Sequence, residues 1–230
     1  MADSVTTVAD LSVTETEISF WQAAWLRLKK NRFAVVSLVF LVLLTITCAL
    51  AAWIVPYPYD LQDLATGASA PSARHWLGTD ILGRDLLTRL LYGGQISLLV
   101  GLCATVVSLL IGVPYGMLSG YCGGKTDAFM MRIVDILYTL PFTILVIILM
   151  VVFGRNFLLL FAAIGAVEWL TMARIIRGDV LAVREQTFIK AAVVLGLSRP
   201  RIIFRHIMPN VLGTIIVYTT LTIPRVMLLE

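Results

Sequence analysis

Long apolar runs separated by short polar segments dominate this chain. Residues 34–55 and 90–124 contain no charged side chain, and further apolar runs follow at about 128–153, 157–176 and 211–229. A helix of about 20 apolar residues is long enough to cross the hydrocarbon core of a bilayer, which is about 30 Å thick. The pattern therefore predicts an all-α polytopic membrane protein with five spans, at 33–55, 95–118, 128–153, 157–176 and 211–229.

The charges between these runs predict an orientation. Residues 1–20 are polar and are predicted to be disordered, and residues 21–32 form an amphipathic lead-in that ends in basic side chains. The loop at 56–94 has a net charge of −1, with four Asp against three Arg. The segment 174–205 carries Asp179 and Glu185 against seven basic residues: Arg174, Arg177, Arg184, Lys190, Arg199, Arg201 and Arg205. Positive charge marks the cytoplasmic side, so the N-terminus and residues 177–210 are expected to be cytoplasmic.

Composition supports a membrane protein, because 59% of the residues are hydrophobic and 14% are charged, against about 25% charged in soluble domains. The two His and three Cys show no metal-ligand spacing, and no nucleophile–base arrangement is visible. These observations argue against an enzyme, a metal site and a nucleic-acid-binding protein. An ion-coupled secondary transporter and a structural assembly subunit remain alternatives.

Residues 185–210 form two short helical patterns on the cytoplasmic side. Phe188, Ala192 and Leu195 are spaced i, i+4, i+7 and predict one apolar stripe. Gly196 is expected to end the first helix in a left-handed conformation, and Ser198 to cap the second. That second helix carries Arg199, Arg201, Arg205 and His206 before Pro209. Its arginines have two open roles, contact with a partner protein or with lipid headgroups.

Two other stretches are singled out by their residue spacing. Gly112, Gly116 and Gly120 are spaced like a face for close helix packing in lipid. In the loop at 56–94, Thr79 or Asp80 is predicted to cap an interfacial helix that starts near Ile81. A direct role in receiving a solute is the alternative for that loop.

The third predicted span should be capped by Asp127 and contains Asp135, and the fourth contains Glu168 in its second half. Charges within spans are functional candidates by default. Here we expect a structural role, by snorkelling towards the cytoplasmic side or by pairing with Arg132, Arg174 or Arg177, because no line of charges suited to a proton relay is visible.

Residues 185–210 also resemble the coupling loop of ABC importer permeases. Ala191-Ala192, Gly196 and Pro209 match the family spacing, whereas Lys190, His206 and Met208 stand where the family usually has Glu, Ile and Leu. The segment 75–85 resembles the dipeptide, oligopeptide and nickel branch of that family. Its matching residues include Gly78, Thr79, Asp80, Gly83, Arg84 and Asp85.

The resemblance implies a C-type permease subunit in a bacterial inner membrane, organised as a tail and lead-in (1–32), an anchor helix (33–55), a loop (56–94) and a permease core (95–230). Its implied partners are a second homologous permease, two ABC ATPase subunits and an extracytoplasmic solute-binding protein. ATP and Mg would be held by the ATPases and no cofactor by this chain. A peptide is the favoured solute, and nickel or another small solute is the alternative.

At least one further span is expected beyond residue 230, so the chain is expected to be truncated relative to this family. The implied coupling residues are Glu185, Phe188, Lys190, Ala191, Ala192, Leu195, Gly196, Arg205, His206 and Pro209.

Overall fold

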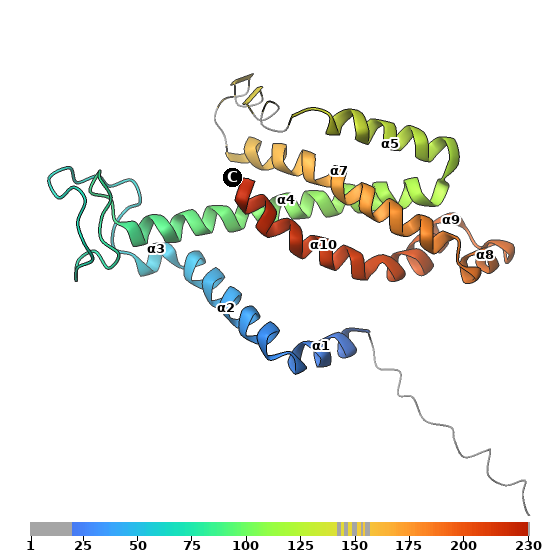
Figure 1. The fold of residues 1–230 in the computed structure, drawn as a ribbon, viewed down its shortest axis with the longest axis horizontal. Coiled ribbons are helices and arrows are strands. Elements are labelled where there is room, and N and C mark those ends of the chain that lie inside the picture. Colours follow the sequence, from blue (N-terminus) through green and yellow to red (C-terminus); the bar gives the residue numbers. More distant parts are fainter. Residues whose placement is uncertain are drawn as a thin grey trace, which may run out of the picture. The chain divides into compact units, whose positions relative to one another are not determined.

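The computed structural model describes residues 20–141, 144, 147–148, 151–152, 154 and 157–229 (Figure 1). Within them every regular element is a helix, and β-pairing is limited to two isolated bridges that involve Thr79. The all-α prediction is therefore confirmed for the described part of the chain. The predicted disorder of residues 1–19 and most of the predicted third span after Pro141 lie outside the described residues.

The chain divides into two units, residues 1–58 and 59–230. The first unit contains α1 (Phe20–Lys30), α2 (Arg32–Ala49) and α3 (Ala51–Ile54). Asn31 caps α2 by accepting a hydrogen bond from the backbone N–H of Ala34 at 3.2 Å. The apolar α2 is long enough to span a membrane, but the single helix predicted at 33–55 is interrupted at Leu50, where α2 ends and the short α3 follows.

The second unit is built around α4 (Leu86–Cys122). At about 1.5 Å per residue, its 37 residues extend for about 55 Å, well beyond a hydrocarbon core. Asp85 caps this helix by accepting from the N–H and the hydroxyl of Thr88, both at 2.8 Å. The predicted helix start near Ile81 with a cap at Thr79 or Asp80 is wrong. The carboxylate of Asp80 instead closes a tight turn, in which it accepts from the N–H groups of Leu82 and Arg84.

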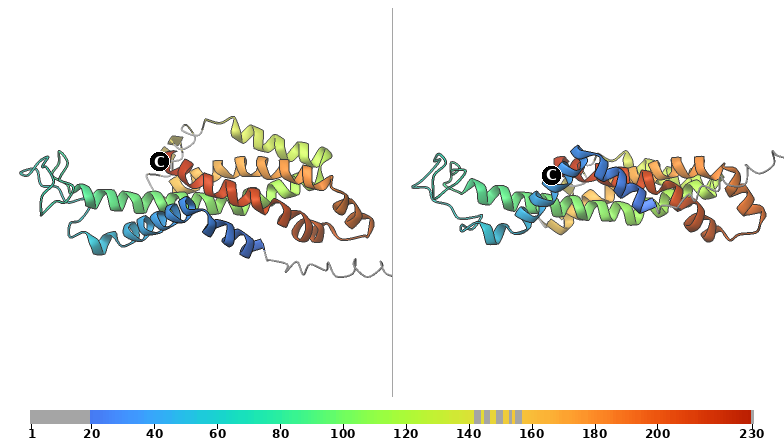
Figure 2. Two further views of the ribbon diagram at one scale, coloured as in Figure 1. Left: turned by 60° about the horizontal axis from the view of Figure 1, so that its bottom comes forward. Right: turned by 90° about the horizontal axis from the view of Figure 1, so that it is seen from below.

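Three further helices pack along α4, namely α5 (Gly124–Tyr138), α7 (Phe157–Arg184) and α10 (Met208–Leu229). In both views of Figure 2, α4, α7 and α10 run side by side. A Cβ at Gly112 would lie 2.7 Å from the carbonyl oxygen of Trp169, and one at Gly120 would lie 2.9 Å from that of Arg177. A Cβ at Gly116 would overlap the carbonyl of Ala173. The three glycines thus let the backbones of α4 and α7 approach closely.

Several predicted helix ends differ from those in the structure. The third span was expected to run through Pro141, but α5 ends at Tyr138 with Thr139 as its C-cap. Proline lacks an N–H and disfavours a helical residue before it, which explains an end at this point. Gly123, at φ +63°, occupies the N-cap position of α5, so the capping role predicted for Asp127 is wrong.

The later helices are longer than predicted. The helix α7 continues to Arg184, and Glu168 therefore lies in its first half rather than the second. Pro224 lies inside α10 without interrupting it. By length and composition, three of the described helices could cross a membrane, at Arg32–Ala49, Leu86–Cys122 and Arg199–Leu228.

Candidate functional site

The elbow, residues 185–210, follows α7 and lies at the end of α4 opposite the 59–85 segment (Figure 1). It contains α8 (Thr187–Val194), α9 (Arg199–Ile202) and a π-helical turn (Ile203–Ile207). Gly196 closes α8 at φ +75°, as predicted. The N–H of Leu197 then donates to the carbonyl of Ala192 at 3.2 Å, and the N–H of Gly196 to that of Val193 at 3.0 Å. This pair of bonds satisfies carbonyls that the helix end would otherwise leave without partners.

The buried face of α8 is formed by Ile189 and Ala192, which are 1% and 4% exposed. The predicted stripe of Phe188, Ala192 and Leu195 is therefore wrong except for Ala192, because Phe188 is 45% and Leu195 80% exposed. The i, i+3 spacing of the buried pair was an equally available signal that the sequence reasoning missed. Five large apolar side chains are left exposed on the elbow, and we call them the elbow apolar surface: Phe188, Val193, Val194, Leu195 and Phe204.

The second half of the elbow joins α10 without a break. Ser198 occupies the N-cap position of α9 as predicted, but its side chain makes no capping bond. At the π turn the N–H of Met208 donates to the carbonyl of Ile203. Pro209 has no N–H to donate, and the side-chain amide of Asn210 donates to the carbonyl of His206 at 2.6 Å. The polar residues of this half remain accessible, since Arg205 is exposed and His206 half-buried.

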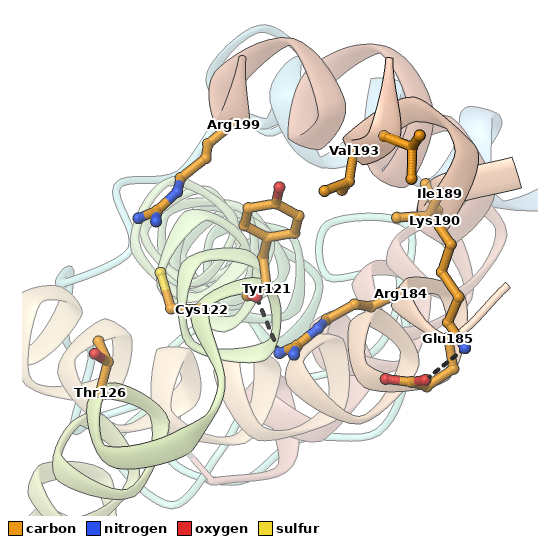
Figure 3. Close-up of a pocket in the computed structure, with 10 residues that line it drawn as sticks. Tyr121, Cys122, Thr126, Arg184, Glu185, Ile189, Lys190, Val193 and Arg199 are labelled. Carbon is orange, nitrogen blue, oxygen red and sulfur yellow. Dashed lines mark hydrogen bonds and ion pairs between the residues drawn. The ribbon is translucent and has the colours of Figure 1, made fainter. Parts of the chain in front are cut away.

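A cavity of about 710 Å³ separates α8 and α9 from the end of α4 (Figure 3). Arg184 lines this cavity and donates a hydrogen bond to the carbonyl of Tyr121 at 3.1 Å. Lys190 lies on the rim, 3.0 Å from the carboxylate of Glu185, and this hydrogen bond lowers the pKa of Glu185. The charge of Lys190 is thus balanced within the elbow itself. The remaining lining residues are Cys122, Thr126, Ile189, Val193, Val194 and Arg199.

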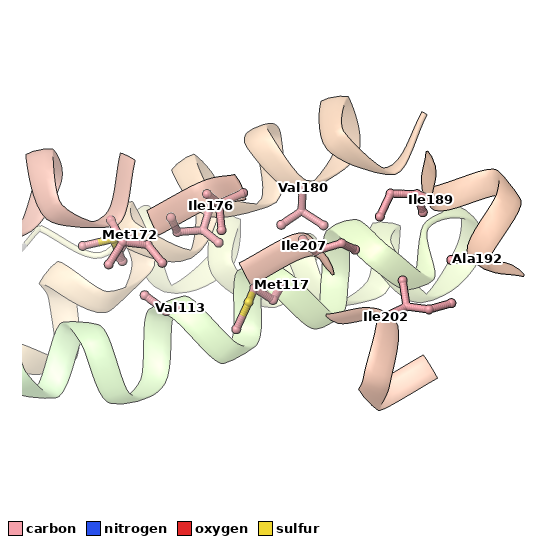
Figure 4. Packing of buried hydrophobic residues seen from close by; sticks show 11 residues of the cluster. Val113, Met117, Met172, Ile176, Val180, Ile189, Ala192, Ile202 and Ile207 are labelled. Atoms are coloured by element: carbon pink, nitrogen blue, oxygen red, sulfur yellow. The ribbon is translucent and has the colours of Figure 1, made fainter. Parts of the chain in front are cut away.

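The elbow shares one hydrophobic core with the long helices (Figure 4). Ile189 and Ala192 of α8 belong to the same cluster as Val180 of α7 and Met117 of α4. The other members are Val113, Met172, Ile176, Ile202, Ile207, Val211 and Ile215. The inner face of α8 is therefore part of one close-packed core with α4, α7 and α10.

A network of polar contacts joins the turn between α4 and α5 to α7. Arg177 donates two hydrogen bonds to the carboxylate of Asp127, which also accepts from the hydroxyl of Ser119. Farther along, Arg174 lies 3.0 Å from Asp135. Both carboxylates therefore pair with the arginines of α7.

Glu168 has a different partner. Its carboxylate lies 3.8 Å from Arg225 of α10, and not against Arg132, Arg174 or Arg177 as expected. Arg225 lies within the last predicted span, at 211–229, and was not among the expected partners. A lone charge inside an apolar run was itself the signal that it needs a partner.

The residues of the 78–85 motif lie together and organise the 59–85 segment. The carboxylate of Asp80 accepts from the N–H of Arg84 at 3.0 Å, from its Nε at 2.9 Å and from Nη1 of Arg89 at 2.6 Å. These bonds, the one from the Arg84 backbone above all, lower the pKa of Asp80 to about 2. Gly78 and Gly83 have positive φ, and a Cβ at either would overlap the backbone of another part of the segment, at Ser69 and Asp63 respectively.

The rest of the motif is also fully bonded. Thr79 donates to the carbonyl of Gly67 at 2.6 Å and accepts from the N–H of Ser69 at 2.9 Å. The carboxylate of Asp85 lies 2.9 Å from Nδ1 of His75. Burial raises the pKa of Asp85, but the hydrogen bonds from Thr88 and His75 outweigh it and the net shift is downward. The motif residues therefore bond mainly to their own segment, which favours a structural role for them.

Comparison with known proteins agrees with this architecture. Residues 112–230 match the family described as the binding-protein-dependent transport system inner membrane component. The chain belongs to this permease family. Residues 19–71 of the permease also match the N-terminal TM domain of oligopeptide transport permease C.

Relatives of the permease are similar over most of its length. The oligopeptide transport system permease protein OppC of Haemophilus influenzae is 45% identical over 234 residues, covering 100% of this chain and 75% of the relative. OppC of Escherichia coli (strain K12) is 49% identical over 214 residues, covering 92% and 71%. The dipeptide transport system permease protein DppC of Bacillus subtilis is 42% identical over 219 residues, covering 95% and 68%. The permease is accordingly similar, over most of its length, to membrane components of oligopeptide and dipeptide transport systems.

Proposed function

We propose that this permease forms part of the path for dipeptides or oligopeptides and is driven by ATP hydrolysis in partner subunits that dock on the elbow. The implied assembly contains a second homologous permease, two ABC ATPases and an extracytoplasmic solute-binding protein. Its N-terminus and elbow would then face the cytoplasm. The exposed elbow apolar surface is the observation that carries the docking proposal.

The docking proposal rests on what the two faces of α8 contact. The inner face is anchored by Ile189 and Ala192, whereas Val194 and Leu195 are 86% and 80% exposed. Aliphatic side chains exposed this far at a helix end, beside the small Ala191, suit insertion into a groove of another protein. The charge pair of Lys190 and Glu185 is exposed, so it adds little stability and remains available at the rim of such an interface.

The contacts that anchor the elbow also support a way in which movement of the ATPases would be transmitted to the long helices. Arg184, the last residue of α7 and directly before the elbow, donates to the carbonyl of Tyr121 in the last turn of α4. The shared core then joins α8 to α7 and α10. Closure of two ATPases would displace the elbow as one piece and rock the long helices between two packed arrangements, which is how packed interfaces switch.

Cross-linking tests this docking. Cysteine is introduced at Ala191, which is exposed on α8, after replacement of Cys48, Cys103 and Cys122. In the complex assembled with its ATPases, a short bifunctional reagent should join position 191 to an ATPase. A matched Trp76→Cys variant, which places the thiol at the opposite end of α4, should give no ATPase adduct. Absence of the adduct at position 191 in a correctly assembled complex would refute the docking.

A further inference from the structure

Glu168 and Arg225 form the one described ion pair between α7 and α10. At about 1.5 Å per residue, Glu168 lies about 16 Å from the start of α7 at Phe157 and about 24 Å from its end at Arg184. Its backbone carbonyl accepts from the hydroxyl of Ser108, in the interior of the apolar α4, at 3.2 Å. A carboxylate beside the middle of such a helix is costly in hydrocarbon, and charges placed there face protein or a water-filled space. In this chain Glu168 is 4% exposed, whereas the side chain of Arg225 is 53% exposed.

The pair is held loosely. Its N···O distance of 3.8 Å is the longest among the ion pairs of the described residues, whereas charge-assisted hydrogen bonds are typically 2.7–2.9 Å. The Asp135–Arg174 pair, for comparison, is at 3.0 Å. A clamp whose purpose is to fix two helices would be expected to close this distance. The Glu168–Arg225 pair makes no such close hydrogen bond, so its two charges can separate without breaking one.

Two cavities meet at this pair. The first, of about 310 Å³, is lined by Glu168, Arg225 and the residues that end α5, including Thr139 and Pro141. The second, of about 230 Å³, is lined by the same charged pair together with hydroxyl-bearing residues. These are Thr171, Tyr218 and Thr222. Irregular backbone at membrane depth, such as the end of α5 before Pro141, is tolerated where it borders a cavity.

We propose that Glu168 and Arg225 line the solute path and separate to take up the oppositely charged ends of a zwitterionic peptide. Glu168 would meet the ammonium end and Arg225 the carboxylate end. In the absence of solute each residue neutralises the other, which avoids an unpaired charge in the membrane. This inference deepens the proposed peptide import and rests on it.

The test measures the reactivity of cysteines placed beside the pair. Thr222→Cys lines the second cavity, and Thr220→Cys lies two residues away on the same helix and lines neither cavity. Both are made without native cysteines in the complex assembled with its partners and reconstituted in proteoliposomes. Anionic and cationic water-soluble methanethiosulfonate reagents should modify position 222 at least about tenfold faster than position 220. Trialanine with ATP should slow modification at position 222 only.

Substitutions of Glu168 and Arg225 then show whether their charges face the second cavity. Glu168→Gln should raise the ratio of anionic to cationic reactivity at position 222 by about fivefold to tenfold, and Arg225→Gln should lower it similarly, as expected for a charge a few ångströms away. An unreactive position 222, or a ratio that neither substitution changes, would overturn the proposal. If the Glu168→Gln variant does not assemble, the Arg225→Gln variant alone provides the comparison of reactivity ratios, because the side chain of Arg225 is exposed.

The charge ratio needs no transport, so it separates this inference from the proposed function. A purified complex that contains no ATPase subunit, or that takes up no peptide, would refute the proposed peptide import. The ratio at position 222 would still report whether Glu168 and Arg225 face water. The two substitutions could change the ratio of anionic to cationic reactivity as expected while trialanine fails to slow modification at position 222. That result would overturn the assignment of a peptide to the pair.

Discussion

Asp80 shows how much one carboxylate can organise in the 59–85 segment. It accepts bonds from two backbone N–H groups and from two arginines, Arg84 and Arg89. The two glycines of the motif, Gly78 and Gly83, allow the backbone to close around it. A motif identified by resemblance thus has a local physical reason for its residue types, and no contact with a solute is needed to explain them.

Acidification should unfold this segment only at very low pH. The pKa of Asp80 is lowered to about 2, from 3.8, chiefly by the backbone hydrogen bond from Arg84. A lowered pKa in the folded state means that the stabilisation is complete above about pH 3.8 and is lost as the pH falls towards 2. Amide-exchange protection of Leu82 and Arg84 should therefore persist at pH 4 and fall sharply near pH 2. In Asp80→Asn protection should already be low at pH 7, and equal protection in both proteins would contradict the role of this carboxylate.

At the scale of helices, the sequence predicted which elements exist better than where they end. Long apolar runs can satisfy their backbone in a membrane only as helices, so α2, α4 and α10 were predictable. Their ends depend on competition for hydrogen bonds. Asp85, rather than Asp80, caps α4 because Asp80 is already engaged in a turn.

The candidate site was predictable to a similar degree. The position of the elbow and its Gly196 turn follow from local chemistry. Which face of α8 is buried does not, because Phe188 and Ile189 are both apolar and only the packing against α7 decides between them. The pairing of Glu168 with Arg225 joins residues far apart in sequence, and no local pattern specifies it.

Gly196 sets the geometry at the end of α8 and should be needed for coupling. Its φ of +75° is unfavourable for any residue with a Cβ, most of all a β-branched one, although a Cβ there would meet no atom within 4 Å. Gly196→Val should therefore shift the elbow at a cost of about 1–2 kcal/mol and reduce peptide uptake several-fold while ATP hydrolysis continues. Gly196→Asn, which tolerates this conformation, should keep uptake near normal. Equal uptake in the Val and Asn variants would argue against this role.

At the scale of the whole second unit, the 59–85 segment and the elbow occupy opposite ends of α4 (Figure 1). A helix of about 55 Å exceeds the thickness of the hydrocarbon core, so both ends project from it. Seven basic residues lie in the segment 174–205 around the elbow end, whereas the loop at 56–94, at the other end, has three arginines and four aspartates. This asymmetry is the basis for an orientation with the elbow in the cytoplasm.

Labelling of single cysteines from the two sides of the membrane should show this orientation. Trp76 and Val194 are 68% and 86% exposed and lie at opposite ends of α4. In a background without native cysteines, a membrane-impermeant maleimide should label Trp76→Cys on intact spheroplasts and Val194→Cys only after permeabilisation. Because Val194 belongs to the elbow apolar surface, co-expression of the ATPases should then slow its labelling several-fold and leave position 76 unaffected. Labelling of position 194 on intact spheroplasts would reverse the orientation, and unslowed labelling in the full complex would place the ATPases elsewhere.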